Sequence, residues 1–304
     1  MSKQFITPNC RGAKESSYIG VGLRHQHFQD ALKGSSSIEF VEVHAENFFA
    51  DGGIASAFLD QFSSQYDISL HSTSMGLGSA IGVNKNYLDR LSRLIQKVDP
   101  VLISDHASFA WSQQNSRNIH AGDLLPLEFS PASLAVLIEN TDRAQQILGR
   151  QLLIENVSSY INLDHSNLQE TEFLVTAVER SNSKLLVDLN NLLVNARNAG
   201  SADALASARQ WLEAIPPSLV GEIHLAGYST NGDFNLIIDD HSQAVSDDCW
   251  TLYRFALERF GPTPTLIEWD NELPSWQRLV AEADKAREIS SQVIALAGEK
   301  NHVA

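Results

Sequence analysis

Short apolar runs recur eight times along the chain, and each one ends at a polar side chain. The runs are Ile19–Leu23, Ile38–Val43, Ile68–Leu70, Val101–Ser104, Leu152–Ile154, Leu185–Val187, Val220–Ile223 and Thr265–Ile267. Segments with apolar residues at helical spacing separate most of them: Ile54–Tyr66, Tyr87–Val98, Ala132–Leu148, Leu168–Glu179, Ala202–Ile215, Cys249–Phe260 and Trp276–Ala297. Buried strands that alternate with helices predict βα units.

Eight such units predict an α/β fold, a (β/α)8 TIM-like barrel. We expect a single domain over residues 1–304, with a core of about residues 18–298 and short terminal extensions. Ser130-Pro131 predicts a helix start, and Gly149 predicts its end. Gly20 and Gly22 lie inside the first run, where they indicate close packing. An open doubly wound sheet is the weaker alternative, because no GxGxxG motif follows a run.

The residues that follow the runs are mostly imidazoles and carboxylates. They are Arg24, His44, His71, His106, Glu155, Asp188, His224 and Glu268. Asp239 and His241 lie two residues apart, so an extended stretch would point both side chains the same way, as ligands rather than as a helix-capping loop. Asp188 to Asn191 forms either a plain turn or a cation site that uses Asp188 or Asn191, and the two interpretations stand about even.

The number of candidate ligands predicts more than one metal ion. A catalytic ion needs about three protein ligands and an open position. The candidates are His71, His106, Glu155, Asp188, His224, Asp239, His241 and Glu268, with Asn191 as a further one. Such a set fits two or three ions that share carboxylates. The two cysteines have no CxxC spacing, so the ligands are nitrogen and oxygen, which suits iron, manganese or zinc.

Composition and net charge limit the classes of partner that we expect the protein to bind. The net charge of −15 disfavours binding to nucleic acid. No apolar stretch reaches the roughly 18 residues of a membrane helix, and Met1-Ser2-Lys3-Gln4-Phe5 does not begin a secretory signal. We therefore expect a cytoplasmic protein that does not associate with membranes.

Several motifs in the chain are long and distinctive. They are Gly20-Val21-Gly22-Leu23-Arg24, Glu42-Val43-His44-Ala45-Glu46-Asn47-Phe48, Glu155-Asn156-Val157-Ser158-Ser159-Tyr160, Asp188-Leu189-Asn190-Asn191, Glu222-Ile223-His224-Leu225-Ala226-Gly227, Asp239-Asp240-His241 and Ile267-Glu268-Trp269-Asp270. With these motifs the chain resembles the multinuclear non-heme iron-dependent oxidative enzymes (MNIO), formerly domain of unknown function 692 or UPF0276. The resemblance covers nearly the whole chain, from about Gly20 to Trp276.

The resemblance implies a xylose-isomerase-like TIM barrel that holds two or three irons as Fe(II) and Fe(III), with dioxygen as co-substrate. The implied ligands are His71, His106, Glu155, Asp188 or Asn191, His224, Asp239, His241 and Glu268. Glu46 and Asp270 would support them or transfer protons, and Arg24 and His44 complete the expected catalytic set. The substrate would be a cysteine-containing, ribosomally synthesised precursor peptide, presented by a small partner protein. The reaction would begin when an iron–superoxo species abstracts hydrogen from the cysteine β-carbon.

Two residues depart from the family pattern. Asp105 precedes His106 where glutamate is commoner, and Tyr228 stands where a histidine is often found. Two other functions remain open on the sequence alone. One is a divalent-metal isomerase or hydrolase of the sugar isomerase or endonuclease type. The other is a non-catalytic binding module with structural metal.

Overall fold

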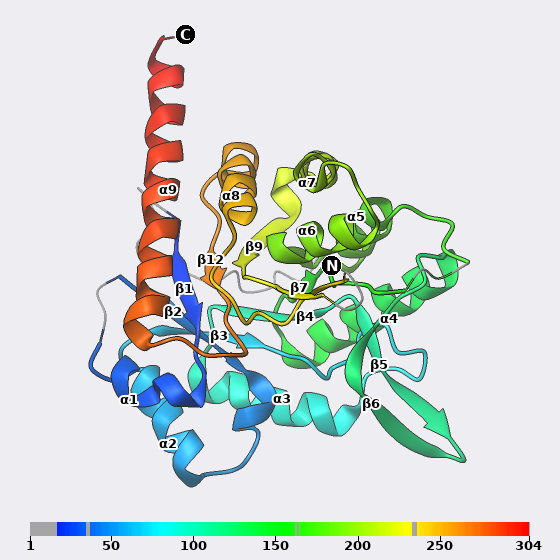
Figure 1. Ribbon diagram of the computed structural model, residues 1–304. Coiled ribbons are helices and arrows are strands. Elements are labelled where there is room, and N and C mark those ends of the chain that lie inside the picture. The colour runs from blue at the N-terminus through cyan, green and yellow to red at the C-terminus, as the bar shows by residue number, and fades with distance from the viewer. Residues whose placement is uncertain (1–16, 35–36, 162, 164, 233–235, 304) are drawn as a thin grey trace. The chain divides into compact units, whose positions relative to one another are not determined.

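The computed structural model describes residues 17–34, 37–161, 163, 165–232 and 236–303. Its main sheet closes into a barrel in the order β1-β12-β9-β8-β7-β4-β3-β2 (Figure 1). These strands are β1 (Ile19–Gly22), β2 (Phe40–His44), β3 (Asp67–His71), β4 (Leu102–His106), β7 (Leu153–Glu155), β8 (Lys184–Asp188), β9 (Val220–Leu225) and β12 (Thr265–Ile267). The predicted (β/α)8 barrel is confirmed.

Helices follow most of the barrel strands. They are α1 (Phe28–Ala31), α2 (Gly53–Phe62), α3 (Lys85–Val98), α4 (Pro131–Leu148), α5 (Glu170–Ser181), α6 (Leu189–Asn198), α7 (Ala204–Glu213), α8 (Asp247–Phe260) and α9 (Trp276–Val303). Short 3-10 helices are η1 (His25–His27), η2 (Ala45–Phe48) and η3 (Pro217–Leu219). The predicted helices are present, with ends that differ by a few residues. No described helix has the length and apolar character needed to span a membrane.

The described chain divides into two compact units. Unit 1 contains Val43–Ser63 and Ile68–Leu186, and unit 2 contains residues 17–42, Ser64–Asp67 and residues 187–303. The expected single domain over residues 1–304 stays a prediction. The predicted extension before Tyr18 lies almost entirely outside the described residues.

Local sequence signals explain the helices of unit 1. Asn84 caps α3, because its side chain accepts hydrogen bonds from the backbone N–H groups of Asn86 and Tyr87. Ser130 caps α4 in a reciprocal capping box, with Pro131 in the first turn. Gly149 ends that helix at a φ of 67°, in the left-handed region where glycine is favoured. The start and the end predicted for this helix are therefore confirmed.

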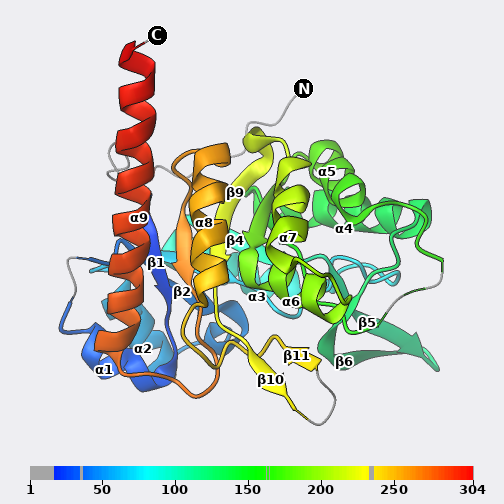
Figure 2. The ribbon, with the colours of Figure 1, turned by 45° about the horizontal axis from the view of Figure 1, so that its top comes forward.

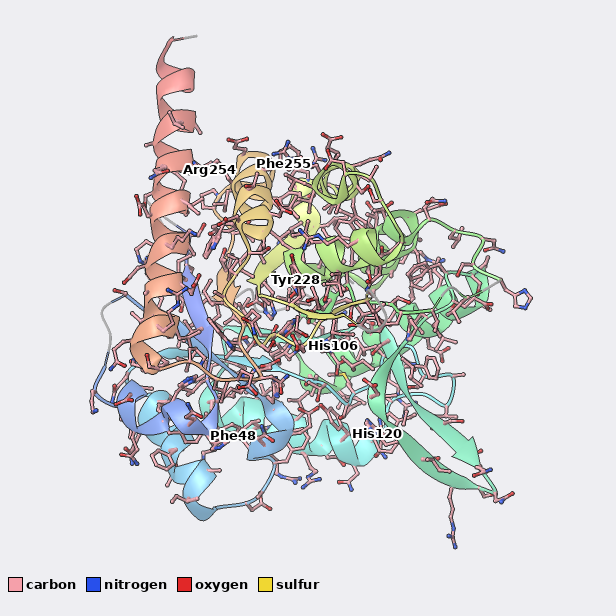
Figure 3. All side chains as sticks on the ribbon, viewed as in Figure 1. Phe48, His106, His120, Tyr228, Arg254 and Phe255 are labelled. Carbon is pink, nitrogen blue, oxygen red and sulfur yellow. The ribbon has the colours of Figure 1, made fainter. Side chains whose placement is uncertain are left out.

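A β-hairpin in unit 1 was not predicted from the sequence. It pairs β5 (Ser108–Gln114) with β6 (Arg117–Pro126) in antiparallel fashion. The Trp111 indole donates to the Ser74 carbonyl at 2.7 Å, which ties the hairpin to the segment after β3. Figure 3 labels His120 on this hairpin, where its ring lies 4.7 Å from that of Trp111. Most residues of β6 are exposed, so the hairpin lacks the continuous apolar pattern that marks the barrel strands.

Unit 2 combines strands β1, β9 and β12 with helices α6 to α9. A Cβ on Gly20 would lie 2.6 Å from the Phe40 ring, so the close packing expected at the first run is present. Helix α9 runs beside β1 and α8 (Figures 1 and 2). It continues to Val303, beyond the predicted helix end at Ala297, and the expected terminal extension stays a prediction. A small hairpin of β10 (Ser229–Asn231) and β11 (Leu236–Ile238) also belongs to this unit.

Candidate functional site

Three buried candidate ligands meet at the ends of neighbouring strands in unit 1. His71 ends β3, His106 ends β4 and Glu155 ends β7, and none is more than 7% exposed. One Glu155 oxygen lies 3.2 Å from His106 Nε2 and 3.5 Å from His71 Nε2. Their ligand atoms lie within 4.8 Å of one another. We call these three residues the His71 group. Two imidazoles and a carboxylate at such spacing are a donor set that suits a metal ion.

Polar side chains behind the His71 group fix its geometry. The His71 Nδ1 atom lies 2.7 Å from the Ser104 hydroxyl, which leaves Nε2 facing Glu155. Asp105, the residue that departs from the family pattern, accepts hydrogen bonds from the backbone N–H groups of Met75 and His106. Burial first, and then the charge of Glu46, raises the pKa of Asp105 well above its usual value.

The predicted residues Glu46 and His44 lie on η2 and β2, close in space to the His71 group. Glu46 accepts hydrogen bonds at 2.9 Å from the backbone N–H groups of Thr73 and Ser74, and another from the Tyr87 hydroxyl. It therefore holds the segment that follows His71. The half-buried His44 ring lies 6.0 Å from the His71 ring.

A second and more acidic group lies in unit 2. Glu268 Oε2 lies 3.1 Å from His224 Nδ1 and 3.4 Å from His241 Nδ1. Asp239 lies 2.8 Å from His241 Nε2. We call these residues, together with Asp188, the Glu268 group. The predicted pairing of Asp239 with His241 is present, but its stated reason is wrong, because His241 has a φ of 47° and the segment is not extended there.

Asp188 begins a helix, which the sequence did not predict. Its Oδ1 accepts the backbone N–H of Asn191 at 2.6 Å and so caps α6. Burial raises the pKa of Asp188 to about 7, against the opposing effect of the His241 charge. The side chain of Asn191 is 4% exposed. The assignment of Asp188 or Asn191 as a ligand stays a prediction.

Arg24 and Asp270 lie against the Glu268 group. The Arg24 Nε donates to Asp270 Oδ1 at 2.8 Å, and a terminal nitrogen of Arg24 lies 3.4 Å from Glu268. Asp270 Oδ2 also lies 3.2 Å from His241 Nδ1. Burial and the Glu268 charge would raise the pKa of Asp270, but Arg24 and His241 lower it below its usual value. Asp270 is therefore a carboxylate that positions both an arginine and a candidate ligand.

Two fully buried glutamates were not predicted from the sequence. Glu42 and Glu222 lie 3.7 and 3.6 Å from His224 Nε2, on the ring edge away from Glu268. Both glutamates lie within strands, whereas the predicted ligands lie at strand ends or in the loops that follow. Glu222 precedes His224 by two residues on β9, so strand periodicity places both on one side. That spacing was the signal available in the sequence.

Replacement of Glu222 by glutamine is expected to weaken metal binding by about 10- to 100-fold and to leave the fold intact. The reason is that a carboxylate on the far side of a ligating histidine orients the ring and raises its basicity. Chelator competition measures the effect. Glu282→Gln is the matched control, because Glu282 is also buried but pairs with Arg278 on α9. Equal metal retention by Glu222→Gln and wild type would contradict this role.

The affinity of the Glu268 group for a metal ion is expected to rise with pH. Burial lowers the pKa of His224 and His241, but the surrounding carboxylates outweigh burial and raise both pKa values well above the usual value. Without metal, both rings therefore hold protons more tightly than a free imidazole does. A metal ion must displace these protons, so its apparent dissociation constant should fall about tenfold per pH unit for each proton released. Metal affinities that are equal at pH 6 and pH 8, measured against a chelator corrected for its own protonation, would contradict this assignment.

Tyr228, the second residue that departs from the family pattern, lies in unit 2 beside an arginine. The Arg197 guanidinium carbon lies 4.7 Å from the centre of its ring, and Arg197 also pairs with Asp248 on α8. Figure 3 labels this tyrosine. A tyrosine at this position therefore stacks against a cation, which a neutral histidine would do less well.

The fold and the two ligand groups define a barrel with the donor set of a metal-dependent protein. Over residues 18–291 the sequence matches the family described as RiPP precursor modification enzyme MbnB/TglH/ChrH. The chain belongs to this family, and the resemblance inferred from its motifs is confirmed.

Curated proteins of similar sequence support this family assignment. A UPF0276 protein of Chromobacterium violaceum is 41% identical over 271 residues, which is 89% of this chain and 94% of that protein. A UPF0276 protein of Paraburkholderia phytofirmans is 40% identical over 302 residues, covering 97% and 95%.

Solved structures show the same fold at low identity. D-Psicose 3-epimerase with D-tagatose from Clostridium cellulolyticum has a TM-score of 0.54 at 12% identity, covering 91% of this chain and 99% of that one. Endonuclease IV from Thermus thermophilus has a TM-score of 0.54 at 13% identity, covering 89% and 97%. At such identity these structures support the xylose-isomerase-like barrel alone.

Proposed function

We propose that the chain is a multinuclear, iron- and dioxygen-dependent enzyme that oxidises a cysteine-containing, ribosomally synthesised precursor peptide. The observation that carries the proposal is the pair of buried ligand groups, each built from imidazoles and carboxylates without a thiolate. Membership in a family of enzymes that modify RiPP precursors supports a peptide substrate.

The donor sets fit iron. His71, His106 and Glu155 would hold one ion. Asp188 or Asn191 with His224, Asp239, His241 and Glu268 would hold one or two more, as Fe(II) and Fe(III). Nitrogen and oxygen donors of this kind suit non-heme iron, and three protein ligands on an ion leave positions for substrate and dioxygen. When bound, iron would activate dioxygen and bind the cysteine thiolate, so that oxidation begins with loss of hydrogen from the cysteine β-carbon.

The protein's own residues would hold the ligands and handle protons. Arg24 and Asp270 fix one another and Asp270 contacts His241, so they set the orientation of that ring. Glu46 keeps the segment after His71 in place. His44, half-buried at the end of β2, would contact the substrate or move a proton. A small partner protein would present the peptide.

The second candidate function is a divalent-metal isomerase or endonuclease, which the structural neighbours suggest by fold. Their identity to this chain is below 25%, whereas the family match spans residues 18–291. The net charge of −15 also opposes a nucleic-acid substrate. The two functions differ in whether dioxygen is consumed.

Oxygen uptake with a cysteine peptide tests the proposal. The peptide would come from a short cysteine-containing reading frame beside the gene, supplied together with the neighbouring small protein. We expect uptake that requires iron and the peptide, with a product whose mass shows oxidation at cysteine. A peptide with serine in place of cysteine is the control. Modification that proceeds equally without dioxygen would contradict the proposal.

A further inference from the structure

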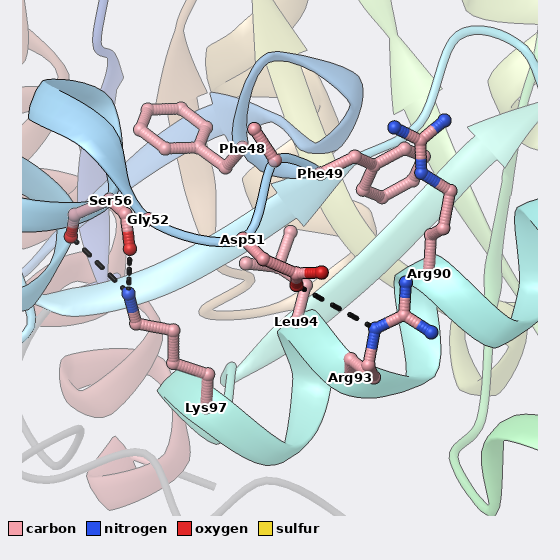
Figure 4. A pocket seen from close by; sticks show the side chains of 10 residues that line it. Phe48, Phe49, Asp51, Gly52, Ser56, Arg90, Arg93, Leu94 and Lys97 are labelled. Carbon is pink, nitrogen blue, oxygen red and sulfur yellow. Dashed lines mark hydrogen bonds and ion pairs between the residues drawn. The ribbon is translucent and has the colours of Figure 1, made fainter.

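A basic cavity lies in unit 1, and none of the residues that line it belongs to either ligand group. It has a volume of about 290 Å³ and lies between the segment that joins η2 to α2 and the side of α3 (Figure 4). Phe48, Phe49, Arg90, Arg93 and Lys97 line it. We call these five residues the basic pocket.

The charge of the basic pocket is opposite to that of the chain. Helix α3 carries Lys85, Arg90, Arg93 and Lys97 against the single acid Asp89, in a chain of net charge −15. Arg90, Arg93 and Lys97 lie at i, i+3 and i+7, so they share one side of the helix. At 1.5 Å per residue they form a row about 10 Å long. Such a row attracts more than one anionic group.

The two arginines keep most of their hydrogen-bonding capacity. The Arg90 guanidinium carbon lies 5.3 Å from the centre of the Phe49 ring, and Arg93 Nε is 3.9 Å from the exposed Asp51 carboxylate. That separation is too long for a hydrogen bond, and neither arginine donates to a side chain elsewhere in the described ranges. Lys97 is engaged with Asp60 and Ser56 (Figure 4 draws the latter contact). Arg90 and Arg93 are therefore the groups available to a ligand.

The start of α2 adds to this positive potential. Gly52, which lines the cavity, is its N-cap and has no side chain to accept the first N–H groups. The first turn of this ten-residue helix also carries no acid. The uncapped N–H groups and the helix dipole favour an anion at this end, in addition to the arginines.

We propose that the basic pocket binds an acidic segment of a peptide. Arg90 and Arg93 would pair with its carboxylates, because the planar guanidinium matches a carboxylate with two parallel hydrogen bonds. A peptide can engage both arginines through separate carboxylates, since acids two apart in an extended strand are about 7 Å from one another, within reach of two long side chains. Phe48 and Phe49 supply apolar contact to the same chain.

The assignment of this peptide as the substrate rests on the proposed function. Phe48 follows His44 by four residues through η2, so the basic pocket is joined by one short helix to a residue beside the His71 group. An acidic segment bound there would hold the peptide through residues other than the reacting cysteine. The acidic remainder of the surface would repel the same segment, which makes the location specific.

Calorimetric titration of the full iron-loaded chain with acetylated hexaglutamate amide at low salt tests the proposal. We expect binding that the double variant Arg90→Gln/Arg93→Gln weakens about tenfold, since each exposed ion pair contributes modestly to affinity. Asp51→Asn should strengthen binding, because it removes the carboxylate that competes for Arg93. Lys85→Gln is the matched control: Lys85 is an exposed α3 cation that pairs with Asp89 outside the pocket.

Three results would overturn the proposal. They are no binding of hexaglutamate by wild type, equal affinity in the double variant, and displacement of the peptide by inorganic phosphate at equal concentration, which would identify a small-anion site.

Hexaglutamine, the uncharged control peptide, should not bind. Iron content of the double variant should equal that of wild type. A chain that binds hexaglutamate but holds no iron would refute the proposed function and leave the basic pocket standing.

Discussion

Alanine at Glu268 is expected to remove iron and turnover together. Its carboxylate faces His224 Nδ1 and His241 Nδ1 at 3.1 and 3.4 Å, so one substitution removes the acid that both imidazoles share. The change also takes a negative charge from Arg24. We expect the loss of at least one iron per chain and a fall in turnover of about 100-fold or more. Elemental analysis and peptide turnover, measured on the same preparation, give the two readouts.

Glu272→Ala is the matched control for this substitution. Glu272 lies four residues further on and is not buried, so its removal should change neither iron content nor turnover. Glu268→Gln keeps the size of the side chain and separates loss of the ligand from a cavity. Full activity in metal-depleted Glu268→Ala would contradict the whole ligand assignment.

Alanine at His106 is expected to remove the ion of the His71 group and to spare the Glu268 group. His106 Nε2 lies 3.2 Å from Glu155, and its ring centre lies 4.6 Å from that of His71, so the loss leaves two ligands where about three are needed. The iron content should fall by one per chain, and turnover by about 100-fold or more. Mössbauer spectra should lose one component and keep the others.

His120→Ala is the control in the same unit, because His120 lies on the β5–β6 hairpin against Trp111. It should retain all iron. If His106→Ala instead lost all of its iron at once, the two groups would not bind ions independently. If it lost none, His106 would not be a ligand.

The convergence of candidate ligands at strand ends could be predicted because the strands of a barrel end on a common rim. Apolar runs covered on both faces are recognisable in sequence, and the residue after each run lies at the carboxyl end of its strand. His71, His106 and Glu155 follow this rule and meet within one group. They converge because the strands that they end, β3, β4 and β7, are neighbours in the barrel.

Other features depend on interactions that the sequence pattern does not encode. Glu42 and Glu222 lie within strands, where a buried charge is costly unless a partner such as His224 compensates. Asp188 was expected in a turn or a cation site, but it caps α6 directly after β8. His241 adopts a positive φ, which no periodicity predicts.

Iron stoichiometry with Mössbauer spectroscopy on protein expressed in iron-replete medium tests the central claim most directly. The two ligand groups predict at least two high-spin non-heme irons per chain, as Fe(II) and Fe(III), in distinct nitrogen and oxygen environments. A protein that holds only zinc, or a single iron per chain, would contradict the multinuclear iron assignment.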